Sequence, residues 1–247
     1  MTCHSGGTLE IYVEPNLPAP LLWVAGTTPI AGALVSLGAA AGFRVWLLDP
    51  IADPSAFPAA ERVLTETNLV ALEPDASPYV VVATQGQWDE EALAGALRRD
   101  ARYVGLVSSP TRATAVRSWL REETGLAEER LAALRAPAGM DLGAETAEEI
   151  ALSILAELVQ VRRGRASFVA SPGPATVAGA TPATTLAPAP DDIVLLDPVC
   201  GMTVDRDHAR HLAEHDGVVY AFCSLGCRTR FVKDPAAFLP ASVESAN

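Results

Sequence analysis

The first 163 residues alternate short apolar runs with stretches of helical periodicity, and this alternation limits the possible folds more than any other feature. The apolar runs lie at 21–25, 43–48, 79–83 and 103–107. Continuous apolar runs are typical of parallel strands that are buried on both faces. Apolar residues recur at helical spacing within 30–41, 89–99, 111–123 and 146–163. This order predicts βαβ units with right-handed crossovers, and therefore an α/β fold with a Rossmann-like, doubly wound parallel sheet.

Composition divides the chain into two compact units. Residues 164–193 are rich in Ala, Pro, Thr and Gly and show no periodicity, which is typical of a flexible linker. We therefore expect a Rossmann-like domain at 20–163 and a second unit at 194–240. The last helix of the first unit begins with a capping box, in which Thr146 and Glu149 satisfy each other's backbone donors. Residues 1–19 contain a strand-like alternation at 8–13, followed by a proline-rich break.

Charge and hydropathy exclude several classes of partner. The formal net charge is −12, and Lys233 is the only lysine. Without a basic run, nucleic acid and anionic membrane surfaces are poor partners. No apolar stretch reaches the about 18 residues of a membrane span, and no secretory signal pattern is present. We therefore expect a cytoplasmic protein.

The cysteines and histidines are concentrated near the C-terminus, since the chain has neither between His4 and Cys200. In a reducing compartment, clustered cysteines indicate metal ligands before disulfides. Cys223 and Cys227 are spaced by one helical turn, so both thiolates can point the same way, and Cys200 reaches them from a distant loop. Three thiolates suit soft ions such as Zn²⁺, Cu⁺ or iron. The sequence does not fix the fourth ligand. The candidates are His211 and His215, with His208 less favoured, and the position could also be left without a protein ligand. Alternatively, the histidines are solvated surface residues.

The turn after the first strand stands where a dinucleotide fingerprint would lie. Gly26 and Ala31 fit the first and third glycine positions of G-x-G-x-x-G/A, but Thr28 replaces the second. Its Cβ obstructs the closest phosphate approach, although its hydroxyl could donate a hydrogen bond. Asp49 ends the second strand, where a ribose-binding carboxylate is found in such folds. Alternatively, the turn is only the small-residue connection that any doubly wound sheet requires.

Ligands of doubly wound sheets bind beyond the carboxyl ends of the strands. Ser109 is positioned to cap the helix that follows it, so free N–H groups there could hold an anion, with Arg112 nearby. Asp89, Asp141 and Glu145 are interpreted as helix-start or loop carboxylates. Because no histidine or cysteine lies inside this fold, we favour a binding or carrier role over catalysis and predict no catalytic residues. The residues expected to face the crevice are Gly26, Thr27, Thr28, Ala31, Asp49, Thr84, Gln85, Gly86, Ser108, Ser109 and Arg112.

Residues 3–163 resemble the xanthine dehydrogenase accessory factor (XdhC/CoxI) family. The resemblance is carried by segments 3–10, 26–31, 84–86, 105–109 and 136–151, of which the last is the most distinctive. It implies a maturation factor that binds molybdenum cofactor and assists its sulfuration or insertion into a molybdenum hydroxylase, and it makes Cys3 a candidate contact to the cofactor sulfur. Gln85 departs from the family, because many members have His there. A further domain precedes the Cys3 segment in the family, so a separate XdhC N-terminal polypeptide is an expected partner.

Residues 197–202 and 220–235 resemble a YHS domain, which implies metal binding by the module at 194–240. Three functions follow from the sequence. The leading one is a molybdenum hydroxylase accessory factor with an appended metal module, whose partners would include a client hydroxylase and a cysteine desulfurase. The alternatives are an NAD(P)-binding oxidoreductase and a metal-trafficking or metal-sensing protein. Whether the chain forms a homodimer is left open by the sequence.

Overall fold

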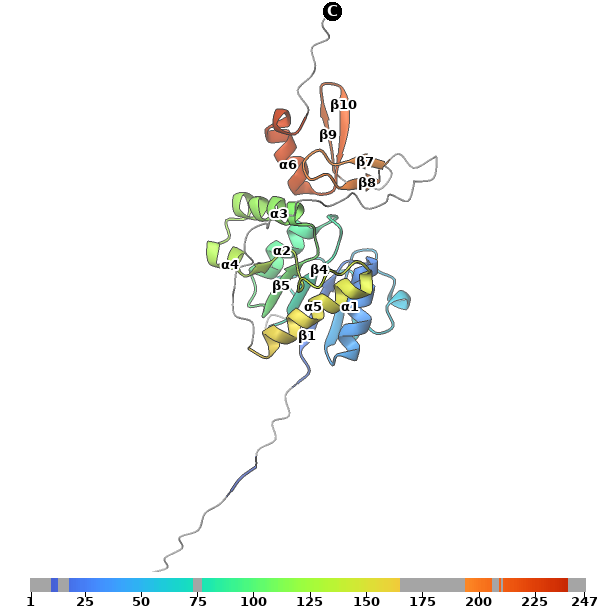
Figure 1. The fold of residues 1–247 in the computed structure, drawn as a ribbon, viewed down its shortest axis with the longest axis vertical. Coiled ribbons are helices and arrows are strands. Elements are labelled where there is room, and N and C mark those ends of the chain that lie inside the picture. The colour runs from blue at the N-terminus through green and yellow to red at the C-terminus, as the bar shows by residue number, and fades with distance from the viewer. Residues whose placement is uncertain are drawn as a thin grey trace, which may run out of the picture.

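The computed structural model describes residues 10–12, 18–72, 77–164, 194–205, 209 and 211–239. Its larger unit is a six-stranded parallel sheet of order β3-β2-β1-β4-β5-β6 (Figure 1). The direction of strand succession reverses between β1 and β4, so the predicted doubly wound sheet is confirmed. The strands are β1 (Leu21–Ala25), β2 (Arg44–Leu48), β3 (Arg62–Leu64), β4 (Tyr79–Val82), β5 (Tyr103–Leu106) and β6 (Leu134–Arg135).

Helices cover both faces of this sheet, and successive residues of β1 pack on opposite sides. Leu22 and Val24 join a core with α1 (Pro29–Ala40) and α5 (Ala147–Arg162). Trp23 and Ala25 join a second core with α2 (Asp89–Leu97) and α3 (Pro110–Glu123). Both cores contain fully buried side chains, which accounts for the continuous apolar strands. The remaining elements are the short helix α4 (Glu128–Ala132) and the 3-10 turn η1 (Pro54–Ala56).

The expected helix boundaries agree with the structure within a few residues, and the capping box of α5 is present. The Thr146 hydroxyl accepts from the N–H of Glu149, while the Glu149 carboxylate accepts from the N–H of Thr146. Sequence analysis missed β3, β6 and α4. These elements are too short to show periodicity, and β3 carries the exposed Arg62. None of the described helices is both long and apolar enough to cross a membrane.

The C-terminal module is a small unit of two antiparallel strand pairs and a helix. The Asp216-Gly217 turn joins β9 and β10, and both residues have positive φ, as a two-residue hairpin of this kind requires. Phe222, Cys227 and Phe231 form its small buried core. The elements are β7 (Val194–Leu196), β8 (Thr203–Asp205), β9 (His211–His215), β10 (Val218–Phe222), α6 (Leu225–Lys233) and the 3-10 turn η2 (Pro235–Ala237).

The predicted linker lies outside the described residues, apart from Gly164. Of the strand expected at 8–13, the structure describes only 10–12, and these residues belong to no strand. Ile11 and Tyr12 are largely exposed. Across the two units, α6 of the module lies against α3 of the larger domain (Figure 1).

Candidate metal centre and cofactor crevice

Three cysteines and one aspartate form a compact group of potential metal ligands. One ligating atom from each of Asp197, Cys200, Cys223 and Cys227 lies within 4.8 Å of all the others. The Cys223 sulfur is 3.4 Å from that of Cys200 and 3.7 Å from that of Cys227. These separations are too long for disulfides, and a tetrahedral ion with Zn–S bonds of about 2.3 Å holds its sulfurs about 3.8 Å apart. The donor set therefore fits a soft metal ion.

Asp197 joins the two loops that carry the cysteines. Its side chain is 1% exposed. Its Oδ1 accepts from the N–H of Val199 at 2.8 Å, and its Oδ2 accepts from the N–H of Cys223 at 2.9 Å. Each carboxylate oxygen keeps a further lone pair that a metal could use. Burial raises the pKa of this carboxyl, because surroundings of low polarity disfavour its charged form. A cation bound beside it would have the opposite effect and favour the carboxylate.

Hydrogen bonding among the three thiols makes Cys200 the most acidic of them. Hydrogen bonds from Cys223 and Cys227 lower the pKa of Cys200 to about 4. The same contacts, together with burial, raise the pKa of the two donor thiols. A bound cation would favour the thiolate form of all three cysteines.

Neither His211 nor His215, the two histidine candidates for the open fourth position, belongs to this group, whereas Asp197 does. His215 faces the edge of the Phe231 ring and lies 3.4 Å from the exposed carboxylate of Asp216. His211 is partly buried, which lowers its pKa, and its Nε2 has no hydrogen-bond partner among the described residues. His208 lies outside the described residues.

The turn at the sheet's reversal point is held by its own hydrogen bonds. Gly26 has φ +112°, and a Cβ there would lie 2.4 Å from the carbonyl oxygen of Ala83. The Thr28 hydroxyl donates to that carbonyl at 3.0 Å and accepts from the N–H of Ala31 at 3.2 Å. Thr28 therefore links the ends of β1 and β4 and caps α1. Its only proton is used inside the protein, so it is not a free donor to phosphate, contrary to our interpretation. Thr27 lies partly buried in the same turn.

Asp49 is also used internally. Its side chain is buried and accepts from the N–H of Ile51 at 3.0 Å. The carboxylate thus closes the turn after β2, whereas a ribose contact requires an accessible oxygen.

A buried charge network follows β4. Arg112 and Asp89 are each 1% exposed, and Nε and Nη2 of Arg112 donate to the same Asp89 oxygen at 3.1 and 2.7 Å. Thr84 donates to the other oxygen of Asp89. The Nη1 of Arg112 donates to the Cys223 sulfur of the C-terminal module at 3.0 Å. Arg112 was predicted to hold an anion, but here it is fully engaged by a carboxylate and a cysteine. The prediction took Asp89 for a helix-start carboxylate and missed this pairing.

The remaining crevice residues fall into two groups. Gly86 is buried and has φ +92°, and a Cβ at this position would lie 2.0 Å from the carbonyl oxygen of Cys223. Its neighbour Gln85 is exposed. Ser109 caps α3 as predicted, accepting from the N–H of Arg112 at 3.3 Å. Ser108 has a buried hydroxyl without a partner among the described residues and lines a hollow of about 350 Å³. Cys3 lies outside the described residues.

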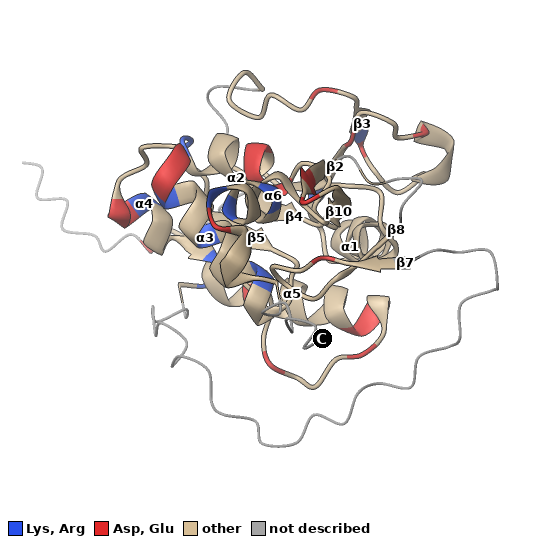
Figure 2. Ribbon diagram, turned by 90° about the horizontal axis from the view of Figure 1, so that it is seen from above, with Lys and Arg blue, Asp and Glu red and all other residues tan. Residues whose placement is uncertain are grey.

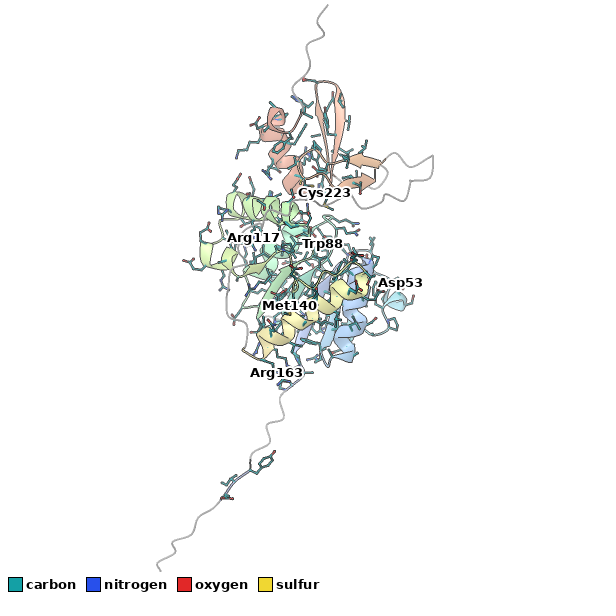
Figure 3. The ribbon with its side chains drawn as sticks, in the orientation of Figure 1. Asp53, Trp88, Arg117, Met140, Arg163 and Cys223 are labelled. Carbon is teal, nitrogen blue, oxygen red and sulfur yellow. The ribbon has the colours of Figure 1, made fainter. Side chains whose placement is uncertain are left out.

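This hollow lies beside the carboxyl end of β5. Its other wall is the loop at 138–144, from the segment that the sequence marked as most distinctive. The N–H of Ala138 donates to the carbonyl of Leu106 at 2.8 Å, which fixes this loop to the strand end. In Figure 3, Met140 lies beside α5, and Cys223 lies at the junction of the module and the larger domain. Acidic and basic residues are interspersed along α3 and α4, seen from above in Figure 2.

Fold and site together define a Rossmann-type domain joined to a small module that carries a cluster of potential metal ligands. The chain belongs to the XdhC family: the model of the XdhC Rossmann domain matches residues 22–158, and that of the YHS domain matches residues 195–242. Both resemblances seen in the sequence are thereby confirmed.

Individual relatives agree with this assignment. The chain is 32% identical over 164 residues to the uncharacterized protein YqeB of Escherichia coli, covering 64% of this chain and 30% of that protein. It is 28% identical over 167 residues to a probable xanthine dehydrogenase subunit of Bacillus subtilis, covering 65% of this chain and 48% of that protein. The chain thus spans less than half of either relative.

A solved structure and a separate relative extend the comparison. The crystal structure of a xanthine dehydrogenase from Bacillus halodurans matches with a TM-score of 0.50 and 26% identity, covering 62% of this chain and 46% of that one. A copper-transporting P-type ATPase of Rhizobium leguminosarum is 46% identical over 50 residues, covering 20% of this chain and 6% of that protein.

Proposed function

We propose that this chain is an accessory factor of a molybdenum hydroxylase of the xanthine or CO dehydrogenase type. In this role it binds molybdenum cofactor and assists the sulfuration or insertion of that cofactor. The observation that carries the proposal is the XdhC Rossmann domain at 22–158. The names of the Bacillus relatives also support a link to xanthine dehydrogenase.

The hollow beside β5 is the part of the chain best suited to this cargo. Its volume of about 350 Å³ lies in the range of small-molecule sites. The unpartnered Ser108 hydroxyl offers a hydrogen bond to a polar ring substituent. The cofactor supplies the molybdenum and pterin chemistry when it is bound. The chain's own contribution is to hold and orient the pterin between Ser108 and the loop at 138–144.

Direct titration tests this role. Purified full-length chain is titrated with molybdenum cofactor released from a molybdenum enzyme, and separately with NAD and NADP. We expect saturable binding of the molybdenum cofactor alone. Ser108→Ala should weaken binding about two- to tenfold, the worth of one hydrogen bond of about 0.5–1.5 kcal/mol. Thr114→Ala, an exposed hydroxyl on α3, serves as the matched control. Binding of a nicotinamide nucleotide without cofactor binding would overturn the proposal.

The structure gives little support to the alternative hypothesis that this chain is an NAD(P)-dependent oxidoreductase. The Asp49 carboxylate is 3% exposed and already accepts a backbone hydrogen bond. The Thr28 hydroxyl likewise closes the turn where a pyrophosphate would approach. Both groups would have to leave their partners to bind a dinucleotide.

The C-terminal module is proposed to hold one soft metal ion, such as zinc, copper or iron. Cys200, Cys223 and Cys227 would supply thiolates, and Asp197 the fourth donor. The similarity to a segment of a copper-transporting ATPase favours metal trafficking or sensing as a second role for this module. Metal transfer to a Cu⁺ chelator faster than spontaneous dissociation would support trafficking, and transfer no faster than dissociation would oppose it.

The proposed partners follow from the accessory role. They are a client molybdenum hydroxylase, a cysteine desulfurase and an XdhC N-terminal polypeptide, within the cytoplasm. Affinity purification from cells that express a molybdenum hydroxylase should recover that enzyme with the chain. Sedimentation of the purified chain will decide between a monomer and a homodimer.

A further inference from the structure

The thiolate group of the module lies directly on the Rossmann domain. Cys223 lies at this boundary (Figure 3). Its sulfur accepts a hydrogen bond from Nη1 of Arg112 at 3.0 Å. Arg112 is 1% exposed and held by Asp89, so its position is fixed from within the Rossmann domain. The guanidinium stabilises the negative charge of the Cys223 thiolate and fixes the sulfur in position, and outer-shell contacts of this kind raise metal affinity. The same hydrogen bond also draws some electron density away from the sulfur.

Two glycines permit this close approach, one on each side. Gly86 of the Rossmann domain would place a Cβ 2.0 Å from the Cys223 carbonyl oxygen. Gly226 of the module would place one 2.9 Å from Oε1 of Glu90 and 3.4 Å from Cβ of Trp119. At Gly86 the backbone of the module leaves no room for a side chain, whereas at Gly226 an added Cβ would force the buried Glu90 side chain to move.

The start of α6 contributes a polar contact between the domains. The N–H of Gly226 donates to Oε1 of Glu90 at 3.3 Å, so a carboxyl group of one domain caps a helix of the other. Ser224 is 1% exposed and also contacts Glu90. An exposed ion pair between Lys233 and Glu122 adds a weak contact at 3.2 Å. The Cys223–Cys227 segment therefore faces both its own metal site and the Rossmann domain.

We propose that Arg112 is a positioning residue of the metal site, which makes this site an interdomain centre. The inference rests on the proposed metal site of the module. Arg112 contributes its hydrogen bond to Cys223 only when the module is docked. Docking therefore strengthens metal binding, and by linkage metal binding strengthens docking by the same factor. A metal-loaded module consequently covers the carboxyl edge of the sheet beside Gly86.

Cobalt(II) titration of the full chain tests the inference through both affinity and spectrum. Gly226→Ala should obstruct docking without touching a thiolate, and it favours helix formation in α6. Arg112→Met removes the side-chain donors altogether. We expect each variant to bind cobalt about 10- to 100-fold more weakly, the usual effect of removing an outer-shell hydrogen bond. The sulfur-to-cobalt charge-transfer band should shift to lower energy, because the thiolate becomes a stronger electron donor. Gly32→Ala is the matched control, because the Cβ added to this helical glycine would only make an ordinary van der Waals contact with the Phe57 ring at 3.8 Å.

A second measurement follows docking itself. Hydrogen exchange of the segment at 84–90 should slow when zinc is added to the native chain, and this change should vanish in Gly226→Ala. Thermal unfolding identifies any variant that fails to fold. If the native chain binds no cobalt, the proposed metal site fails. If Gly226→Ala binds cobalt with native affinity and spectrum, and zinc leaves exchange at 84–90 unchanged, the site stands and the interdomain coupling is overturned.

Discussion

Glu90 offers a sharp test of the contact between the domains, because it is a carboxyl group buried where the module meets α2. Its side chain is 2% exposed and lies 3.6 Å from Arg112. Burial raises the pKa of this carboxyl from 4.5 to about 7, although Arg112 opposes the change, and the neighbouring Asp89 adds to it. The perturbation is Glu90→Gln, which keeps the shape and removes the titration.

The sign of the pH effect on the stability of the native chain follows from proton binding to Glu90. Between pH 4.5 and about 7, the folded chain holds a proton on Glu90 that the unfolded chain has lost. This proton stabilises the fold below that window, and the stabilisation is lost as the pH rises through it. At about 1.4 kcal/mol per pKa unit, the full loss amounts to about 3.5 kcal/mol, of which about 2.5 kcal/mol falls between about pH 5 and about pH 7.5. The glutamine variant has no such loss, so its stability relative to the native chain should rise with pH by about this amount.

Urea denaturation followed by tryptophan fluorescence measures the effect. The native chain and Glu90→Gln are compared from about pH 5 to about pH 7.5 in the presence of a chelator, which removes pH-dependent metal binding. Glu91→Gln is the matched control, since Glu91 is the next residue of α2 and is exposed. This control should follow the native pH dependence. Parallel pH profiles for the native chain and Glu90→Gln would refute the reasoning.

Three further outcomes are expected. Cys223→Ser should abolish stoichiometric metal in elemental analysis of the purified chain, and full retention would refute the three-thiolate site. Gly26→Ala should destabilise the chain by more than about 3 kcal/mol in urea denaturation, because its Cβ would meet the Ala83 carbonyl. Gly143→Ala, where φ is also positive but space is open, should cost only about 1 kcal/mol, and equal losses would contradict the steric argument. Thr146→Ala should cost about 1 kcal/mol through the lost cap of α5, and an unchanged urea midpoint would contradict it.

The fold was predictable where apolar patterns are long. Strand β1 is buried on both faces, and its continuous apolar run identified it at once. By contrast, β6 has only two residues and β3 three, so neither carries a pattern that distinguishes a strand from a loop. The capping box of α5 was predictable because both of its partners lie within one helical turn.

The site was predictable only in part, because much of it depends on contacts between distant segments. The three cysteines are rare residues grouped near one end, so their association was visible in the sequence. Asp197 belongs to the segment that carried the YHS resemblance, but its burial beside the three cysteines depends on the tertiary fold and was not visible in the sequence. The contact between Arg112 and Cys223 joins two domains, and no local pattern marks it. Local spacing suggested an anion site for Arg112, and the burial of Asp89 beside it changed its role.

Anomalous diffraction from a crystal of the zinc-loaded full chain tests the account most directly. The account predicts one zinc peak per chain, bonded to Cys200, Cys223 and Cys227, with the Arg112 guanidinium in hydrogen-bond contact with the Cys223 sulfur. A zinc peak away from the cysteines, or a zinc-loaded module detached from α3, would contradict it.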